Sequence, residues 1–218
     1  MLGRRLDTAE PTWEARIDVE SQPYLEDHRI QGSVVFPAAG YVEMATQAVR
    51  TMTGGDAVLA DIELRKALFL PAGPEGSTGG TAPVQLSFRG EDAAFTIATA
   101  SRGDTGERTV HAHGTVRSAQ RGHHRRFLPL DVDSVRSRST RRLSGAACYE
   151  ALAGLGYHYG PAFQGIEQVW IGPGEALARI RPPEPIGDDA ARHHVHPGRA
   201  GLLLPDAADT SRSSGPGR

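Results

Sequence analysis

The sequence has a single cysteine, Cys148, few aromatic residues and no long apolar run. Of its 218 residues only 6% are aromatic, and the formal net charge is -2. One cysteine excludes an internal disulfide framework, and the near-neutral charge excludes a global attraction to nucleic acid or anionic membrane. No segment approaches the roughly 20 apolar residues that span a bilayer, and the polar N-terminus lacks the apolar core of a signal peptide. We therefore expect a cytoplasmic globular protein with neither nucleic acid nor membrane as a partner.

Residues 23–45 hold the side chains best suited to chemistry. His28 lies on a polar turn, Gly32 follows four residues later, and Pro37 precedes an apolar stretch with helical period. This order predicts an imidazole beside a helix N-terminus, where unpaired N–H groups and the helix dipole stabilise negative charge. A base beside such a site is suited to removing a proton from the carbon next to a carbonyl. On these residues alone, a surface histidine before an ordinary helix is the alternative.

Periodicity predicts one central helix followed by antiparallel strands. Over residues 38–52 the apolar residues recur at helical spacing, and Gly54-Gly55 ends the pattern. Apolar and polar residues alternate in several later segments, with a Gly, Pro and Ser loop predicted at 73–80. We therefore expect an α+β fold in which a sheet curls around the helix. The apolar helix face comprises Tyr41, Ala45, Ala48, Val49 and Met52, and the expected strands cover residues 16–20, 58–70, 84–88, 95–97 and 110–116.

The second half is set off by a basic, serine-rich segment. Because this segment contains a single aromatic residue, Phe127, and base stacking uses several, a solvated linker is favoured over a nucleic-acid site. An apolar helix is expected at 146–155, and strands at 169–171 and 176–180. We therefore divide the chain into an N-terminal unit at 1–120, a linker at 121–138 and a C-terminal unit at 139–218.

Two motifs resemble the dehydratase domain of type I polyketide synthases, which is related to that of animal fatty acid synthase. The first is His28-x3-Gly32-x4-Pro37, and the second is Tyr159-Gly160-Pro161-x-Phe163-x-Gly165. The resemblance implies a double hot-dog fold, in which each of two repeats wraps an antiparallel sheet around a central helix. One full set of helix and strands is expected before the linker and only the opening of another after it, so we expect a complete first repeat here and a second repeat that begins near residue 139 and is cut short.

The resemblance further implies a function. Such a domain dehydrates a β-hydroxyacyl thioester, held on the phosphopantetheine of an acyl carrier protein, to the α,β-enoyl thioester. His28 would be the general base, with Gly32, Pro37, Tyr159, Gly160 and Pro161 positioning the substrate. No metal or diffusible cofactor is implied. The implied partners are the carrier protein, the neighbouring synthase domains and a second copy of the intact synthase as a homodimer.

The chain departs from the family where the catalytic acid is expected. The resemblance implies an Asp five residues after a His-Pro pair and a Gln or His four residues further on. His196-Pro197 is present, but Gly201 occupies the Asp position, and neither Asp206 nor Asp209 fits the spacing. Codons can be chosen for residues 198–208 that, read one nucleotide later, encode Ala-Ala-Leu-Asp-Ser-Cys-Phe-Gln-Thr-Leu-Leu. This reading restores both spacings, so we expect a frameshift near residue 197 and a non-native tail at 198–218.

Two alternatives remain open. Without the Asp, the chain can be a non-catalytic acyl-binding or structural remnant of the same fold. The histidines at 111 and 113, or at 193, 194 and 196, are compatible with zinc, although neither set has a recognised ligand spacing. We therefore expect no metal site.

Overall fold

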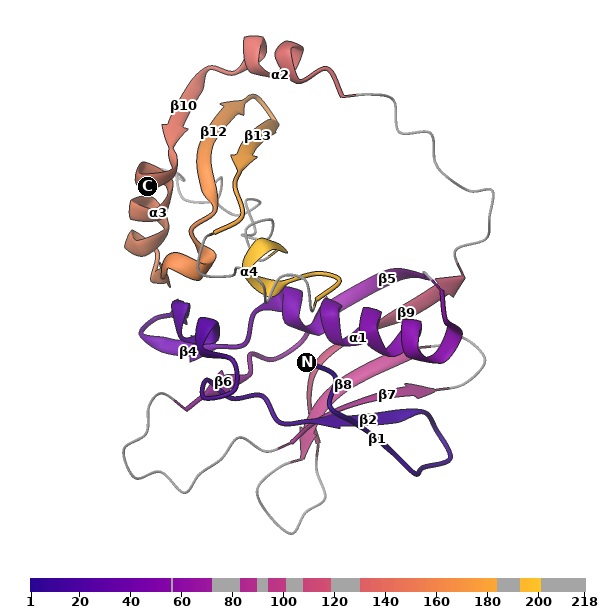
Figure 1. Ribbon diagram of the computed structural model, residues 1–218. Helices are drawn as coiled ribbons and strands as arrows, with labels where there is room; N and C mark the ends of the chain where they lie inside the picture. Colours follow the sequence, from indigo (N-terminus) through magenta and orange to yellow (C-terminus); the bar gives the residue numbers. More distant parts are fainter. Residues whose placement is uncertain are drawn as a thin grey trace, which may run out of the picture.

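The structure is a computed structural model that describes residues 1–55, 57–71, 83–89, 94–100, 108–118, 130–183 and 193–200 (Figure 1). Its helices are α1 (Ala38–Thr53), α2 (Val132–Arg138), α3 (Gly145–Gly154) and α4 (Pro197–Ala200), with 3-10 turns η1 (Pro23–Asp27) and η2 (Pro161–Phe163). Its strands are β1 (Arg4–Leu6), β2 (Thr12–Ala15), β3 (His28–Ile30), β4 (Ser33–Val35), β5 (Ala57–Leu64), β6 (Phe69–Leu70), β7 (Val84–Arg89), β8 (Ala94–Ala100), β9 (Arg108–Ser118), β10 (Arg141–Ser144), β11 (Tyr157–Tyr159), β12 (Ile166–Gly172) and β13 (Glu175–Ile180).

Helix α1 is the centre of the first half, as its period predicts. It ends at Gly54, which takes the left-handed conformation (φ 67°) and donates its N–H to the carbonyl of Arg50 at 2.8 Å. Glycine adopts this conformation without a steric cost, so it is suited to ending a helix. Four of the five predicted face residues are buried, whereas Met52 is 38% exposed because it lies in the last turn.

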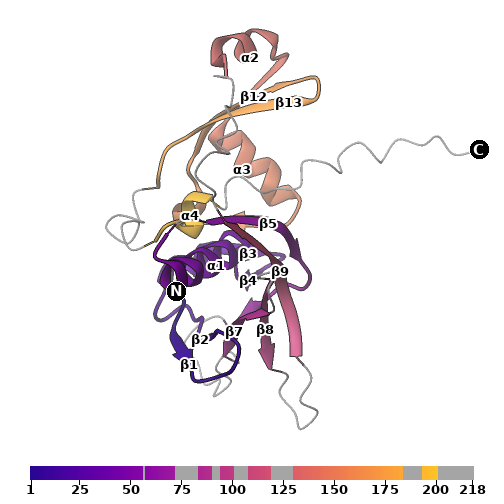
Figure 2. The same ribbon diagram turned by 90° about the vertical axis from the view of Figure 1, so that its right-hand side faces the viewer.

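A six-stranded antiparallel sheet curves around α1 in the order β1-β2-β7-β8-β9-β5 (Figures 1 and 2). Alternate residues of its strands point toward the helix, so Leu86, Phe95 and Ile97 are buried against Met44 of α1. Burial of each such side chain contributes roughly 1.5–3 kcal/mol. The predicted α+β class and the curled sheet are confirmed. The predicted loop at 73–80 lies outside the described residues.

Three predictions from the sequence are wrong in detail. The single strand expected at 58–70 is two strands, because the chain changes partner: β5 pairs with β9, residues 65–68 form no strand, and β6 pairs with β4 in another sheet. The strand expected at 16–20 is replaced by β2, which ends at Ala15 opposite Val84, the first residue of β7; residues 16–20 pair with no strand of the described residues, although Ile17 is fully buried. The end of the expected linker forms helix α2, which is capped where the Asp131 carboxylate accepts the N–H of Ser134 at 3.0 Å. A side-chain cap of this kind satisfies an N–H that a helix leaves unpaired.

The second half contains a three-stranded antiparallel sheet, β10-β12-β13, beside helix α3. Ser144 caps α3 by accepting the N–H of Ala147 at 3.2 Å. The helix expected at 146–155 is α3, and the strands expected at 169–171 and 176–180 lie within β12 and β13. In Figure 2 these elements stack on the side of α1 where α4 lies.

A third sheet joins the two halves. Strand β11 of the second half pairs with β3 of the first, giving the order β11-β3-β4-β6. The pairing sets Tyr159 opposite His28, so residues from both halves meet at one place. Among the described residues, no helix is both long enough and apolar enough to cross a membrane.

Candidate active site

His28 is a buried base whose tautomer is fixed by the backbone. It begins strand β3, is 7% exposed, and its Nδ1 lies 2.8 Å from the carbonyl oxygen of Val35. A carbonyl only accepts hydrogen bonds, so Nδ1 carries the proton and Nε2 of the neutral ring keeps its lone pair. Burial lowers the pKa of His28 below its usual value, and the bond to Val35 only partly opposes this effect. The imidazole is therefore neutral at physiological pH.

Two aromatic rings from the second half cover the imidazole. Tyr159 stacks on it with centroids 5.1 Å apart and planes at 26°, and Phe163 packs at 5.0 Å. Burial also raises the pKa of the Tyr159 hydroxyl, which therefore stays protonated as a hydrogen-bond donor. The first half alone does not complete the site.

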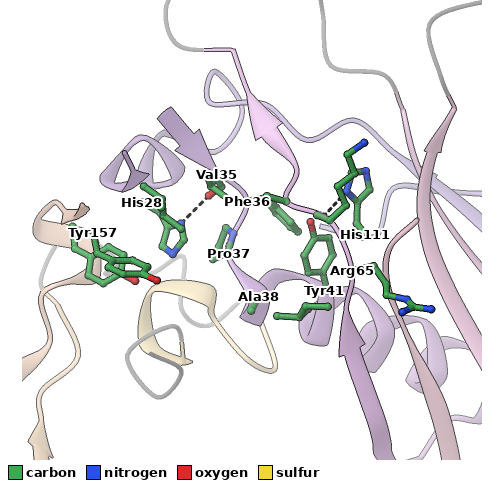
Figure 3. A pocket seen from close by; sticks show the side chains of 14 residues that line it. His28, Val35, Phe36, Pro37, Ala38, Tyr41, Arg65, His111 and Tyr157 are labelled. Atoms are coloured by element: carbon green, nitrogen blue, oxygen red, sulfur yellow. Dashed lines mark hydrogen bonds between the residues drawn. The ribbon is translucent and has the colours of Figure 1, made fainter. Parts of the chain in front are cut away.

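A cavity of about 290 Å³ extends from His28 toward β9 (Figure 3). Its walls are mostly apolar, and helix α1 begins at one of them, where the first N–H groups of a helix have no intrahelical partner. Tyr41 and His111 lie toward the end opposite His28. Burial raises the pKa of Tyr41, so its hydroxyl stays neutral. The lining residues are His28, Ile30, Val35, Phe36, Pro37, Ala38, Tyr41, Leu64, Arg65, Lys66, Ala67, His111, Tyr157 and Tyr159.

His111 is held by hydrogen bonds on both ring nitrogens. Its Nδ1 donates to the carbonyl of Lys66 at 2.8 Å, and its Nε2 lies 2.9 Å from the hydroxyl of Thr99. The ring is 3% exposed, and burial lowers its pKa. His113 instead pairs with Glu63 at 3.0 Å, and no group of three metal-binding side chains is found among the described residues.

Asp27 connects the two halves next to His28. Its carboxylate accepts the N–H of Ala162 at 2.8 Å, and its carbonyl accepts the N–H of Gly160 at 2.7 Å. A Cβ at Gly160 would lie 2.2 Å from the Asp27 carboxylate oxygen, so a side chain cannot be accommodated there without a shift. Asp27 therefore holds η2, and with it Phe163, against the imidazole.

The residues predicted to position substrate divide into two groups. Pro37 and Tyr159 line the cavity beside His28. Gly32 lies instead in an exposed hairpin turn, where Gln31 (φ 49°) and Gly32 (φ 81°) both have positive φ, as a type I′ turn requires. Gly160 and Pro161 do not line the cavity and shape the η2 turn behind it.

Sequence reasoning missed Asp27, Glu43, Tyr41 and His111 as contributors to the site. Asp27 directly precedes His28, but its partners are backbone groups far along the chain. Glu43 is fully buried within α1 and likewise binds distant backbone N–H groups. No spacing pattern in the sequence reports such long-range contacts.

The chain matches two family profiles. Residues 1–102 match "Polyketide synthase dehydratase domain", and residues 127–200 match "Polyketide synthase dehydratase N-terminal domain". The chain belongs to the polyketide synthase dehydratase family. The resemblance described from the two motifs is therefore confirmed.

Similar proteins agree with this assignment. Polyketide synthase GfsE of Streptomyces halstedii is 32% identical over 228 residues, which cover 97% of this chain and 6% of GfsE. The dehydratase domain from the CurF module of curacin polyketide synthase is 25% identical, with a TM-score of 0.79 over 92% of this chain and 72% of that one. The corresponding CurK domain is 26% identical, with a TM-score of 0.76 over 92% and 70%. The chain thus spans a small part of the curated relatives it matches.

Proposed function

We propose that the chain comes from a dehydratase domain that removes water from a β-hydroxyacyl thioester and leaves the α,β-enoyl thioester. The observation that carries this proposal is the buried imidazole of His28, fixed in one tautomer beside an apolar cavity. The substrate is carried on the phosphopantetheine of an acyl carrier protein. The scheme requires no metal or diffusible cofactor.

His28 is the base in this scheme. Its Nε2 takes the proton from the α-carbon, the C–H electron pair forms the α,β double bond, and the bond from the β-carbon to oxygen breaks. An acid protonates the departing hydroxyl, which leaves as water. The neutral state of the buried ring supports the base role, and N–H groups at the start of α1 are suited to polarising the thioester carbonyl. The Tyr159 hydroxyl donates a hydrogen bond near the reacting carbon.

The acid is the component that this sequence lacks. The inactive variants of the CurK dehydratase include one with His replaced by Phe and one with Asp replaced by Asn. The two replaced residues of CurK are separated by the same number of positions as His28 and Gly201 here. This agreement supports Gly201 as the position where the family has its acid. Asp206 and Asp209 lie outside the described residues.

A frameshift near residue 197 accounts for the missing acid. With suitable codons, one nucleotide of displacement gives Asp at 201 and Gln at 205, and the family profile matches up to residue 200. Under this proposal residues 198–218 do not belong to the domain, and the second repeat is cut short by the shift.

Sequencing the gene across codons 190–218 and beyond tests the frameshift. Removal of one base near codon 197 should open a frame of more than about fifty codons, enough for several further strands. The frame-restored domain should dehydrate a β-hydroxyacyl pantetheine thioester, and His28→Ala should abolish this activity. The 218-residue chain should be inactive, because losing a general acid costs on the order of 100-fold or more. Stop codons soon after the shift would contradict the frameshift, and turnover by the 218-residue chain would contradict the need for residue 201.

A non-catalytic acyl-binding role is the second candidate, and the Gly at position 201 favours it for the chain as it stands. The cavity beside His28 would then bind an acyl thioester without converting it. Saturable binding of a β-hydroxyacyl thioester by the 218-residue chain, with no enoyl product, would support this role. Loss of that binding in a cavity variant such as Tyr41→Trp would place the ligand in the cavity that His28 and Tyr41 both line.

The family implies partners that we also propose for this domain. These are the acyl carrier protein, the neighbouring synthase domains and a second copy of the intact synthase as a homodimer in the cytoplasm. Size-exclusion chromatography with light scattering on the frame-restored domain tests the dimer.

A further inference from the structure

Glu43 is a carboxylate buried completely inside the fold. It lies on α1 and is 0% exposed. Its Oε1 accepts the N–H of His194 at 3.1 Å, and its Oε2 accepts the N–H of Val195 at 2.6 Å. Burial of a charged group is costly unless hydrogen bonds replace its water. Both oxygens of Glu43 thus bind one short segment that lies more than 150 positions away in the sequence.

The segment that Glu43 holds leads directly into helix α4. His196 follows it, is 3% exposed, and accepts the N–H of Gly198 on its Nδ1 at 3.1 Å. Helix α4 begins at Pro197 and contacts α1 (Figure 1). The two bonds to Glu43 therefore set where α4 starts relative to α1.

A series of ring contacts connects this segment to the base. The ring of His196 packs against Tyr24 with centroids 4.8 Å apart, and Tyr24 lies 6.4 Å from Phe163. Phe163 in turn packs on His28 at 5.0 Å. The beginning of α4 thus belongs to the same packed group of rings as the imidazole.

We propose that Glu43 is a positioning residue, whose carboxylate holds the chain before α4 so that the residues after His196 approach the cavity of His28. Its catalytic consequence rests on the proposed function, because the acid position is five residues after His196. Glu43 itself does not line the cavity and is not a catalytic residue.

Amide hydrogen exchange of the 218-residue chain, followed by NMR, tests the anchoring without any assay of activity. In Glu43→Gln the side-chain oxygen still accepts one N–H, but the NH₂ group faces the other N–H donor. We expect at least one of the two amides, at 194 or 195, to exchange at least tenfold faster, with amides of β8 and β9 unchanged. Glu150→Gln is the matched control, because Glu150 is exposed on α3 and should leave both amides as they are.

Two results would overturn the anchoring. One is unchanged exchange at 194 and 195 in a folded Glu43→Gln chain, and the other is an equal increase throughout the sheet. If Glu43→Gln unfolds the chain, Val195→Pro tests the anchoring instead. This substitution removes the N–H that donates to Oε2 of Glu43 and leaves the sequence of α1 unchanged. The anchoring then requires faster exchange at 194 with β8 and β9 unchanged, and an unchanged amide at 194 rejects it.

Kinetics of the frame-restored domain test the catalytic consequence separately. Glu43→Gln should lower kcat at least tenfold and leave KM within about twofold, because Glu43 touches the segment and not the cavity. An unchanged kcat in a domain that dehydrates would reject the positioning role. A frame-restored domain without any activity would reject the proposed function, while the exchange result would still decide the anchoring.

Discussion

Tyr159 lies directly opposite His28 in the ladder of β11 and β3, and its ring stacks on the imidazole at 5.1 Å. The two residues come from different halves of the chain. The stack therefore depends on contacts that dock β11 and η2 onto the first half. Asp27 supplies two of these, through its carboxylate and its carbonyl.

Replacing Asp27 by Ala should weaken this docking. The N–H of Ala162 would lose its acceptor, and an unsatisfied, partly buried donor costs about 1–3 kcal/mol. We expect a loss of that size in the free energy of unfolding measured with urea, together with a change in the NMR shifts of His28. Glu26→Ala is the control, because Glu26 is exposed on the same 3-10 turn. Equal effects of the two substitutions would argue against a special role for Asp27.

Replacing Gly160 by Ala should destabilise the fold, although it adds only one methyl group. The new Cβ would lie 2.2 Å from the Asp27 carboxylate, so either the carboxylate or η2 must move. Strain of this kind typically costs about 1–3 kcal/mol. The same substitution at Gly154 meets no atom within 4 Å at the end of α3, and it should be neutral or stabilising by up to about 1 kcal/mol. Comparable melting temperatures for the two variants would show that the turn tolerates a side chain.

The parts of the fold that follow from local period could be predicted from the sequence. Helix α1, its stop at Gly54 and the alternation of β7 all report burial of one face, which is a local signal. Helix α2 was missed because its seven residues, about two turns, depend on the Asp131 cap rather than on an apolar stripe. The strand expected at 16–20 is not formed although Ile17 is buried, because alternation reports burial and not backbone pairing; among the described residues, the pairing of β2 with β7 ends at Ala15.

Only part of the candidate site could be predicted from the sequence. The motif around His28 predicted a base and a helix start, and the structure places His28 and Pro37 on one cavity. Asp27 and Glu43 could not be assigned because both carboxylates bind backbone N–H groups. Every residue except proline has an N–H, so the partner leaves no mark on the sequence.

Acid should destabilise the protein through His111. Burial holds the folded pKa of His111 below its unfolded value of about 6.5, so on acidification the unfolded chain binds this proton first. Its contribution to stability is complete above about pH 6.5 and is lost as the pH falls toward the folded pKa. One such group contributes a slope of up to about 1.4 kcal/mol per pH unit. We expect His111→Gln to flatten the pH dependence of the unfolding free energy below about pH 6.5, although it lowers stability at pH 7. An unchanged slope in His111→Gln would contradict this account.

The ring of Tyr159, stacked on His28, should lower the basicity of this imidazole by excluding water from it. Burial is the largest influence on this imidazole and lowers its pKa. Tyr159→Leu removes the stacked ring and admits water, so the pKa should rise toward the ordinary value of about 6.5. Tyr159→Phe keeps the ring and should leave the pKa of His28 near that of the parent chain. An NMR titration of the imidazole in the 218-residue chain measures all three values without requiring turnover. In the frame-restored domain the base must be neutral, so kcat/KM should fall as the pH drops through this pKa, and Tyr159→Leu should move that fall to higher pH. A pKa of His28 that is the same with leucine and with tyrosine at position 159 would show that the stack does not exclude water from the base.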